Sequence, residues 1–248
     1  MFQLMLAVTI ARRIGGGIPI VGYDMPEWSL RGLKPQSIPG PSIYLRSHKF
    51  DMACIIYLYG VGAISSIKIL DWGMRVEYFK NIEMYRNLFK VKNNSSIEIR
   101  ENKILFHIRG EDISSGMHAE YFPVPFLFYE KLIDETGLQP VFMGQLAPDA
   151  YTDAIRERFK GARFLPAQSA IDDFSLIRKA RNIGLSTSSF SWLAAWFSTC
   201  AESIYLPARG LFEPGHPHTN LLPVGDGRYH FYDIGFPALA DRKGPRCC

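Results

Sequence analysis

The sequence predicts an α/β fold that contains a parallel β-sheet. The 248 residues are 47% hydrophobic and 21% charged, which is the composition of a globular protein with one large or two small domains. After residue 97, short apolar runs alternate with segments of helical periodicity, as expected for successive βαβ units. The apolar runs are nearly continuous, which is typical of parallel strands buried on both faces.

The chain begins with an apolar stretch at residues 1–11 that predicts a buried or amphipathic helix. A signal peptide is not expected, because the two arginines follow the stretch instead of preceding it. Three glycines at 15–17 end the helix, and residues 18–23 predict a short strand. Residues 26–48 contain four prolines and are expected to be irregular.

Residues 52–67 form the longest uncharged apolar run of the chain. Its 16 residues are fewer than the roughly 20 needed to cross a bilayer, so a buried element is predicted. A helix is predicted over 81–90. The Asn-Asn-Ser-Ser turn at 93–96 is the expected boundary between an N-terminal domain, 1–97, and a C-terminal domain, 98–248.

Strands and helices are expected to alternate through the second domain. Each predicted strand is a short apolar run, and each predicted helix has apolar side chains at helical spacing. The predicted strands are 103–108, 141–143, 162–166, 183–186 and 204–206. The predicted helices are 125–135, 149–160, 172–181 and 189–199. Ligands of such sheets bind at the carboxyl ends of the strands, often against helix N-termini.

Charge is unevenly distributed along the chain. Residues 1–97 carry 12 Lys/Arg and 6 Asp/Glu, whereas the remaining residues carry 16 and 18. A basic first domain can face an anionic surface or a phosphate-bearing ligand, but the charge alone favours an ordinary solvated surface. No nucleic-acid-binding motif accompanies it. The four cysteines are too few for a disulfide scaffold and favour a reducing, cytoplasmic location.

The first candidate group follows the predicted strand 103–108 and so lies at its carboxyl end. Arg109 can grip a phosphate with its planar fork of donors. Asp112 can orient Arg109, and His107 can brace the loop or touch a ligand. A surface loop with an ordinary Arg–Asp pair explains the same residues equally well.

Two further groups lie at predicted helix starts. Residues 186–189 are four consecutive hydroxyl residues, whose side chains and neighbouring N–H groups can cap the helix or bind an anion. Capping is the commoner role. Asp172 and Asp173 open another helix, where acidic residues stabilise the helix dipole. Asp173 can alternatively accept a hydrogen bond from a nucleobase or ribose.

Several motifs of cofactor and metal chemistry are absent from the sequence. It contains no P-loop, no Gly-x-Gly-x-x-Gly, no zinc-type Cys/His spacing and no nucleophile elbow. His216 and His218 are expected to be loop residues instead of metal ligands. Because no Asp-x-Asp is present to hold a metal on a diphosphate, a diphosphate site here would use Arg109 and helix N–H groups.

Together these groups resemble the α-1,2-fucosyltransferases of glycosyltransferase family 11. Three motifs agree with that family in order and spacing: His-x-Arg-x-x-Asp at 107–112, Asp-Asp-Phe at 172–174, and Ser-Ser-Phe-Ser-Trp-x-Ala-Ala-Trp at 188–196. Met-Phe-Gln at 1–3 is similar to the end of the family's Gly-Asn-Gln-Met-Phe-Gln segment. The chain resembles more loosely the superfamily that includes α-1,6- and protein O-fucosyltransferases.

The resemblance implies a GT-B-like fold, in which two Rossmann-type halves with parallel sheets face a cleft. The family's Gly-rich loop is missing before Met1, so the N-terminal half is expected to be incomplete. The implied activity is transfer of fucose from GDP-fucose to a glycan hydroxyl, in α-1,2 linkage to a galactoside, with inversion. No metal or other cofactor is implied. A carboxylate would take the acceptor proton, with Asp24 and Glu27 as N-terminal candidates.

The motif match also implies roles for individual residues. Arg109 would contact the diphosphate, and His107 and Asp112 would shape its loop. Asp173 would lie near the nucleoside. The remaining donor-binding residues would lie at the helix start: Ser188, Ser189, Phe190 and Ser191.

Two departures from the family pattern leave alternatives open. Gly110 replaces the second arginine of the family loop, and Glu111 replaces its glycine, which brings a negative charge near the expected diphosphate. One alternative is a non-catalytic relic that binds a sugar nucleotide or glycan, and another is a transferase with a different nucleotide sugar. The expected partners are a nucleotide-sugar donor and a glycan acceptor, without nucleic acid. A lipid-linked acceptor would bring the protein to the inner face of a membrane.

Overall fold

The structure is a computed structural model that describes residues 1–35, 37–46, 48–90, 97–110 and 120–234. Its α-helices are α1 (Phe2–Arg13), α2 (Met52–Gly60), α3 (Ile82–Leu88), α4 (Phe126–Thr136), α5 (Ala150–Arg158), α6 (Ala170–Lys179) and α7 (Ser189–Trp196). Its strands are β1 (Asp24–Met25), β2 (Leu30–Arg31), β3 (Ser42–Leu45), β4 (Ser66–Ile69), β5 (Lys103–Ile108), β6 (Gln139–Gly144), β7 (Arg163–Phe164), β8 (Asn182–Gly184), β9 (Ser203–Pro207) and β10 (Tyr229–Tyr232). Short 3-10 helices are η1 (Pro26–Trp28), η2 (Val76–Tyr78) and η3 (Gly210–Phe212).

A six-stranded sheet in the order β10-β9-β8-β5-β6-β7 forms the larger part of the fold. All of its neighbouring strands are parallel, which confirms the parallel sheet predicted after residue 97. The chain runs outward from β5 to β7, returns to β8 beside β5, and then runs outward to β10. Numbered along the chain, this is the order 3-2-1-4-5-6 of doubly wound nucleotide-binding sheets. The order reverses between β5 and β8.

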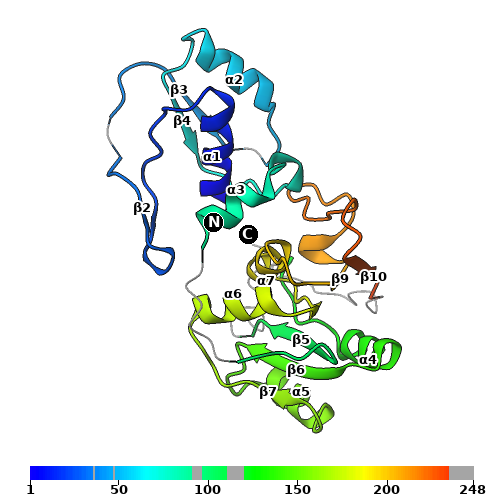
Figure 1. The fold of residues 1–248 in the computed structure, drawn as a ribbon. Coiled ribbons are helices and arrows are strands. Elements are labelled where there is room, and N and C mark those ends of the chain that lie inside the picture. Colours follow the sequence, from blue (N-terminus) through cyan, green and yellow to red (C-terminus); the bar gives the residue numbers. More distant parts are fainter. Residues whose placement is uncertain (36, 47, 91–96, 111–119, 235–248) are drawn as a thin grey trace, which may run out of the picture.

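Helices cover both faces of this sheet (Figure 1). One face packs against α4 and α5 and includes Phe106 and Phe142. The opposite face packs against α6 and α7 and includes Leu105 and Ile183. Because side chains alternate along a strand, His107 shares the face of Leu105 and lies on the α6–α7 side.

Residues 1–90 pack on the α6–α7 side of the large sheet (Figure 1). β3 and β4 form a two-stranded parallel sheet joined through α2, and β1 pairs with β2 in an antiparallel hairpin. Phe2 of α1 stacks on Trp192 of α7 with ring centroids 6.0 Å apart. Trp28 meets the ring of Phe174 in α6 edge-on at 4.8 Å. One continuous apolar cluster therefore joins residues 1–90 to the sheet.

Every strand and helix predicted after residue 97 is present. The strand predicted over 18–23 is wrong, because Gly22 adopts a positive φ of 76° and only Val21 pairs, with Leu33. The element predicted over 52–67 forms α2, which is not fully buried, since Tyr57 is 67% exposed. The turn at 93–96, on which the predicted division into two domains depends, lies outside the described residues.

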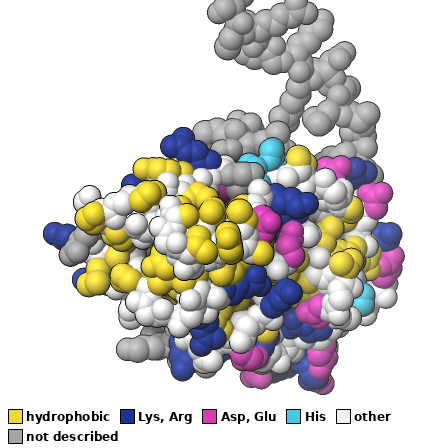
Figure 2. Space-filling view, turned by 90° about the horizontal axis from the view of Figure 1, so that it is seen from above, with side chains coloured by type: hydrophobic (Ala, Val, Ile, Leu, Met, Phe, Trp, Pro, Cys, Tyr) yellow, Lys and Arg dark blue, Asp and Glu magenta, His cyan; other side chains and the backbone are white. Residues whose placement is uncertain are grey.

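The surface formed by residues 1–90 exposes several large apolar side chains. Figure 2, seen from above these elements, shows hydrophobic side chains gathered among basic ones. The exposed apolar residues of this segment are Leu33, Ile38, Tyr44, Tyr57, Val61, Leu70 and Trp72. Within the described ranges, none of the helices combines the length and the apolar character that a membrane span requires.

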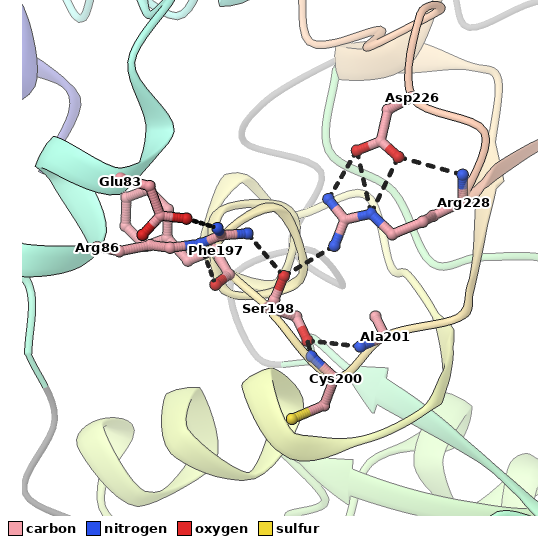
Figure 3. Close-up of polar contacts among 8 residues, drawn as sticks. All are labelled: Glu83, Arg86, Phe197, Ser198, Cys200, Ala201, Asp226 and Arg228. Atoms are coloured by element: carbon pink, nitrogen blue, oxygen red, sulfur yellow. Dashed lines mark hydrogen bonds and ion pairs between the residues drawn. The ribbon is translucent and has the colours of Figure 1, made fainter.

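Two arginines hold the C-terminal end of α7 (Figure 3). Arg86 of α3 donates hydrogen bonds to the carbonyl oxygens of Phe197 and Ser198, each at 2.8 Å. Arg228 donates to the Ser198 oxygen at 2.8 Å and is itself fixed by the carboxylate of Asp226. Carbonyls at a helix C-terminus lack intrahelical partners and attract cations. This arginine clamp (Arg86 and Arg228) ties α7 to α3 and to the start of β10.

Candidate functional site

The candidate site lies at the carboxyl ends of β5 and β8. These two strands are neighbours, yet the chain continues from them toward opposite edges of the sheet. In open α/β sheets, ligands bind at such a point of reversal. The structure therefore brings to neighbouring strand ends two groups that the sequence places apart along the chain: residues 107–110 at the end of β5 and residues 186–191 after β8.

His107 links β5, β8 and α7. Its Nδ1 atom lies 3.4 Å from the Ser186 hydroxyl oxygen, which lies 3.4 Å from the hydroxyl oxygen of Ser191. The imidazole ring also contacts the ring of Phe190, with centroids 5.6 Å apart. His107 thus braces the start of α7 against the end of β5.

The protonation state of His107 follows from its burial. Desolvation, and secondarily the positive charge of Arg109, lower the pKa of His107 from 6.5 to about 4. The imidazole is therefore neutral near pH 7 and leaves Arg109 as the local cation. A base with so low a pKa is a weak proton acceptor at neutral pH, so His107 suits positioning better than proton transfer.

Arg109 follows the last residue of β5. Its guanidinium lies over the ring of Tyr121, 4.6 Å from the centroid, and this cation–π contact orients the side chain. Tyr121 is held in turn by its neighbour Phe122, whose carbonyl accepts a hydrogen bond from the Thr187 hydroxyl at 2.7 Å. The roles of Tyr121 and Thr187 are not evident from the sequence, because their partners lie on distant segments.

The structure gives a steric reason for the glycine at position 110, where the resemblance to family 11 would predict an arginine. The N–H group of Gly110 donates to the Gln145 side chain at 3.0 Å. A Cβ atom at position 110 would lie 2.9 Å from the Gln145 carbonyl oxygen, which leaves no room for an arginine without movement of the β6 end. Glu111 and Asp112 lie outside the described residues.

Ser188 immediately precedes α7 and is 1% exposed. Within the described part of the chain, its hydroxyl has no hydrogen-bond partner, and α7 has no side-chain cap. Helix capping therefore does not explain Ser188. Leaving a buried hydroxyl unpaired costs about 1–3 kcal/mol, and a ligand bound at the start of α7 would supply the partner. The half-buried Ser189 begins the helix itself.

Asp173 lies in the first turn of α6, whose N-terminus is capped by Ser169. Burial, and then the charge of Asp172, raise the pKa of Asp173 from 3.8 to about 6. The adjacent Phe174 contacts Phe190 with ring centroids 5.3 Å apart, which places this turn beside the start of α7. Asp173 thus borders the site without a described contact to Arg109.

The surface also has a cavity of about 1020 Å³ at the opposite end of the sheet. It lies beside residues that precede β5, β8 and β9, including Asn102, Arg181 and Glu202. None of the predicted site residues lines it. In the described ranges, no three His, Cys, Asp or Glu side chains converge in a way that could hold a metal ion.

Comparison with known protein families, with curated proteins and with solved structures found no match to this chain. The functional assignment therefore depends on the geometry described above and on the sequence motifs that predicted it.

Proposed function

We propose that this chain binds the diphosphate of a nucleotide sugar at the carboxyl ends of β5 and β8 and transfers the sugar to a glycan hydroxyl. One observation carries the proposal. At the reversal of a 3-2-1-4-5-6 sheet, the oriented cation of Arg109 and the buried hydroxyl of Ser188 lie at the strand ends that flank the start of α7, and that hydroxyl has no partner among the described residues. This is the chemistry that an anionic diphosphate requires.

GDP-fucose is the donor that the motif set supports best. The family 11 resemblance predicts fucose transfer with inversion and without a metal. It also predicts a GT-B-like arrangement in which residues 1–97 form the acceptor side. The packing of residues 1–90 over the α6–α7 side of the sheet is compatible with this arrangement. A lipid-linked glycan would bring the exposed apolar and basic surface of this segment to a membrane.

The reaction would proceed by direct displacement. The acceptor oxygen forms a bond to the anomeric carbon while the bond from that carbon to the β-phosphate oxygen breaks. GDP leaves with the electron pair, so negative charge grows on its β-phosphate. Arg109 and the N–H groups at the start of α7 would stabilise that charge, and such preorganised donors are worth several kcal/mol. His107 would hold Ser186 and Ser191 in place.

The test is donor turnover by the purified full chain. GDP release from GDP-fucose is measured with lactose as acceptor, and GDP-mannose and an ADP-sugar serve as competing donors. We expect turnover with GDP-fucose and a roughly 10- to 150-fold lower kcat/KM for Arg109→Ala, the range for one charged hydrogen bond. Turnover with another nucleotide sugar but not with GDP-fucose would contradict GDP-fucose as the donor. A folded chain without turnover of any donor would contradict transferase activity.

A further inference from the structure

A second polar cluster lies where residues 1–90 meet the segment between β9 and β10. It contains three histidines and two carboxylates from four segments of the chain. We call it the histidine cluster, and its members are His48, Asp71, Glu120, His216 and His218. The ring centroids of His48 and His218 lie 4.2 Å apart, and those of His216 and His218 lie 5.7 Å apart.

Backbone hydrogen bonds hold the cluster in place. The Val76 N–H group donates to the Asn220 carbonyl at 2.7 Å, and the Asn220 N–H group donates to the Met74 carbonyl at 2.9 Å. Residues 74–76 are thereby joined to the segment that carries His216 and His218. The Thr219 hydroxyl also donates to the Leu211 carbonyl at 2.9 Å. His216 and His218 therefore lie on a segment whose backbone is tied to residues 74–76.

His48 and Asp71 form an oriented imidazole–carboxylate pair. The Nδ1 atom of His48 lies 2.7 Å from Oδ2 of Asp71. The Asp71 side chain is 6% exposed, and its other oxygen accepts a hydrogen bond from the Gly73 N–H group at 2.9 Å. Because a carboxylate only accepts, the Nδ1–H group of His48 donates this bond, and in the neutral ring Nε2 is the acceptor. The His48 side chain is 40% exposed, so Nε2 lies on a side chain that solvent reaches.

The cluster is connected to the candidate site through Glu120. Nε2 of His216 lies 3.2 Å from the Glu120 carboxylate, and Nδ1 of His216 accepts from the Thr219 N–H group at 3.1 Å. The next residue, Tyr121, lies beneath the guanidinium of Arg109. Glu120 of the histidine cluster is thus the chain neighbour of Tyr121, whose ring orients Arg109.

We infer that His48 is the general base that takes the acceptor proton, with Asp71 as its positioning residue. The inference rests on the proposed transferase function and adds the group that its displacement step requires. As the acceptor oxygen bonds to the anomeric carbon, its proton passes to Nε2 of His48, and GDP departs with the electrons of the broken bond. The imidazolium so formed is stabilised by the Asp71 carboxylate.

The other candidate bases fit less well. Asp24 and Glu27, suggested by the sequence, are exposed on and beside the β1–β2 hairpin, and Asp24 pairs with Arg31 at 3.8 Å. Figure 1 shows β2 on the side of the molecule opposite β9 and β10. The low pKa of His107 makes it a weak base near pH 7.

The experiment compares His48→Ala with His230→Ala, an exposed histidine of β10 that lies outside the cluster. GDP affinity is measured by calorimetry, and fucose transfer to lactose is measured as kcat and KM. We expect His48→Ala to bind GDP with unchanged affinity and to lose about 10²- to 10⁴-fold in kcat, the usual contribution of a general base. Added imidazole should restore part of the lost rate, and Asp71→Asn should lower kcat to a smaller extent.

The outcomes separate this inference from the proposed function. Transfer by the unmodified chain that persists in His48→Ala, or a loss that imidazole does not restore, would overturn the role of His48 and leave the transferase assignment standing. Absence of transfer by the unmodified chain would overturn both. An equal loss in His230→Ala would mean that the effect is structural and would also contradict the inference.

Discussion

The buried imidazole of His107 makes the stability of the fold depend on pH. Its pKa is about 4 in the folded chain, against 6.5 for an ordinary histidine. Between these values the unfolded chain binds a proton that the folded chain does not. His107 therefore lowers the free energy of unfolding as the pH drops below about 6.5, and its favourable contribution is fully present above that value. The raised pKa of Asp173 acts in the opposite direction, so the contribution of His107 is isolated by comparing variants.

We expect His107 to cost about 2 kcal/mol of stability when the pH is lowered from 7.5 to 5. Urea unfolding at both pH values measures this difference. In His107→Gln the pH-dependent loss should shrink by about that amount, whereas the exposed His230→Gln should retain it. An unchanged pH dependence in His107→Gln would show that the histidine is not buried in its neutral form.

Ser188 and Ser191 give a matched pair of buried hydroxyls with opposite expectations. Ser188 has no described partner, so Ser188→Ala should leave the free energy of unfolding unchanged or raise it. Ser191 donates to the Ser188 carbonyl at 3.2 Å, so Ser191→Ala should cost about 1 kcal/mol. Ser188→Ala should nevertheless weaken GDP binding. Chemical unfolding and GDP titration of both variants provide the check, and a destabilised Ser188→Ala that binds GDP normally would contradict the assignment.

At the residue scale, the sequence predicts which side chains lie at strand ends but not which groups hold them. His107, Arg109 and Ser188 can be singled out because each lies at or just beyond the carboxyl end of a predicted strand, and parallel strand ends share one edge. The contacts of Arg109 with Tyr121 and of Thr187 with Phe122 cannot be predicted from the sequence. They depend on where the segment after residue 119 returns to the sheet, which no local pattern determines.

At the level of elements, the arginine clamp fixes the end of α7 that is remote from the site. Arg86→Ala would leave the carbonyl oxygens of Phe197 and Ser198 without one of their donors. We expect it to lower the free energy of unfolding by about 1.5–3 kcal/mol, the range for hydrogen bonds to a charged group. Arg13→Ala, at the exposed end of α1, is the matched control and should change it by less than about 0.5 kcal/mol. Equal effects of the two variants would contradict the clamp.

Most elements of the large sheet could be predicted because local and tertiary preferences agree there. Strands β5, β6, β8 and β9 are apolar runs buried on both faces, and α4 to α6 show helical spacing and clear ends. β10 could not be predicted, because its Tyr-His-Phe-Tyr sequence lacks an aliphatic run. Among the described strands, it pairs with β9 alone. β3 and β4 pair with each other across 24 residues, a register that their short sequences do not specify.

Over the whole molecule, one apolar cluster spans α1, α3, α6, α7 and one face of the sheet. We therefore expect residues 1–90 and the sheet to unfold in a single cooperative transition. Trp28, Trp192 and Trp196 lie in this shared core, so tryptophan fluorescence reports on it, and far-ultraviolet circular dichroism reports on the helices and strands. The two signals should give coincident urea transitions. Separate transitions would show that the two parts are independent domains, as a division at residue 97 would allow.

The strand order is the whole-molecule feature that brings the two groups of site residues to neighbouring strand ends. Alternating strands and helices predict a parallel sheet, but several strand orders are compatible with that pattern. The observed 3-2-1-4-5-6 order places β5 beside β8, so Arg109 and the start of α7 follow the carboxyl ends of neighbouring strands. Hydrophobic periodicity alone does not predict this neighbourhood.

The central claim is that this neighbourhood binds a nucleoside diphosphate through Arg109, and calorimetric titration with GDP tests it most directly. We predict micromolar binding by the full chain and a loss of about 1.5–3 kcal/mol in Arg109→Ala. Arg158→Ala should bind as the unmodified chain does, since Arg158 pairs with Glu130 on the opposite face of the sheet. A folded chain that does not bind GDP, or that binds it equally well without Arg109, would contradict the claim.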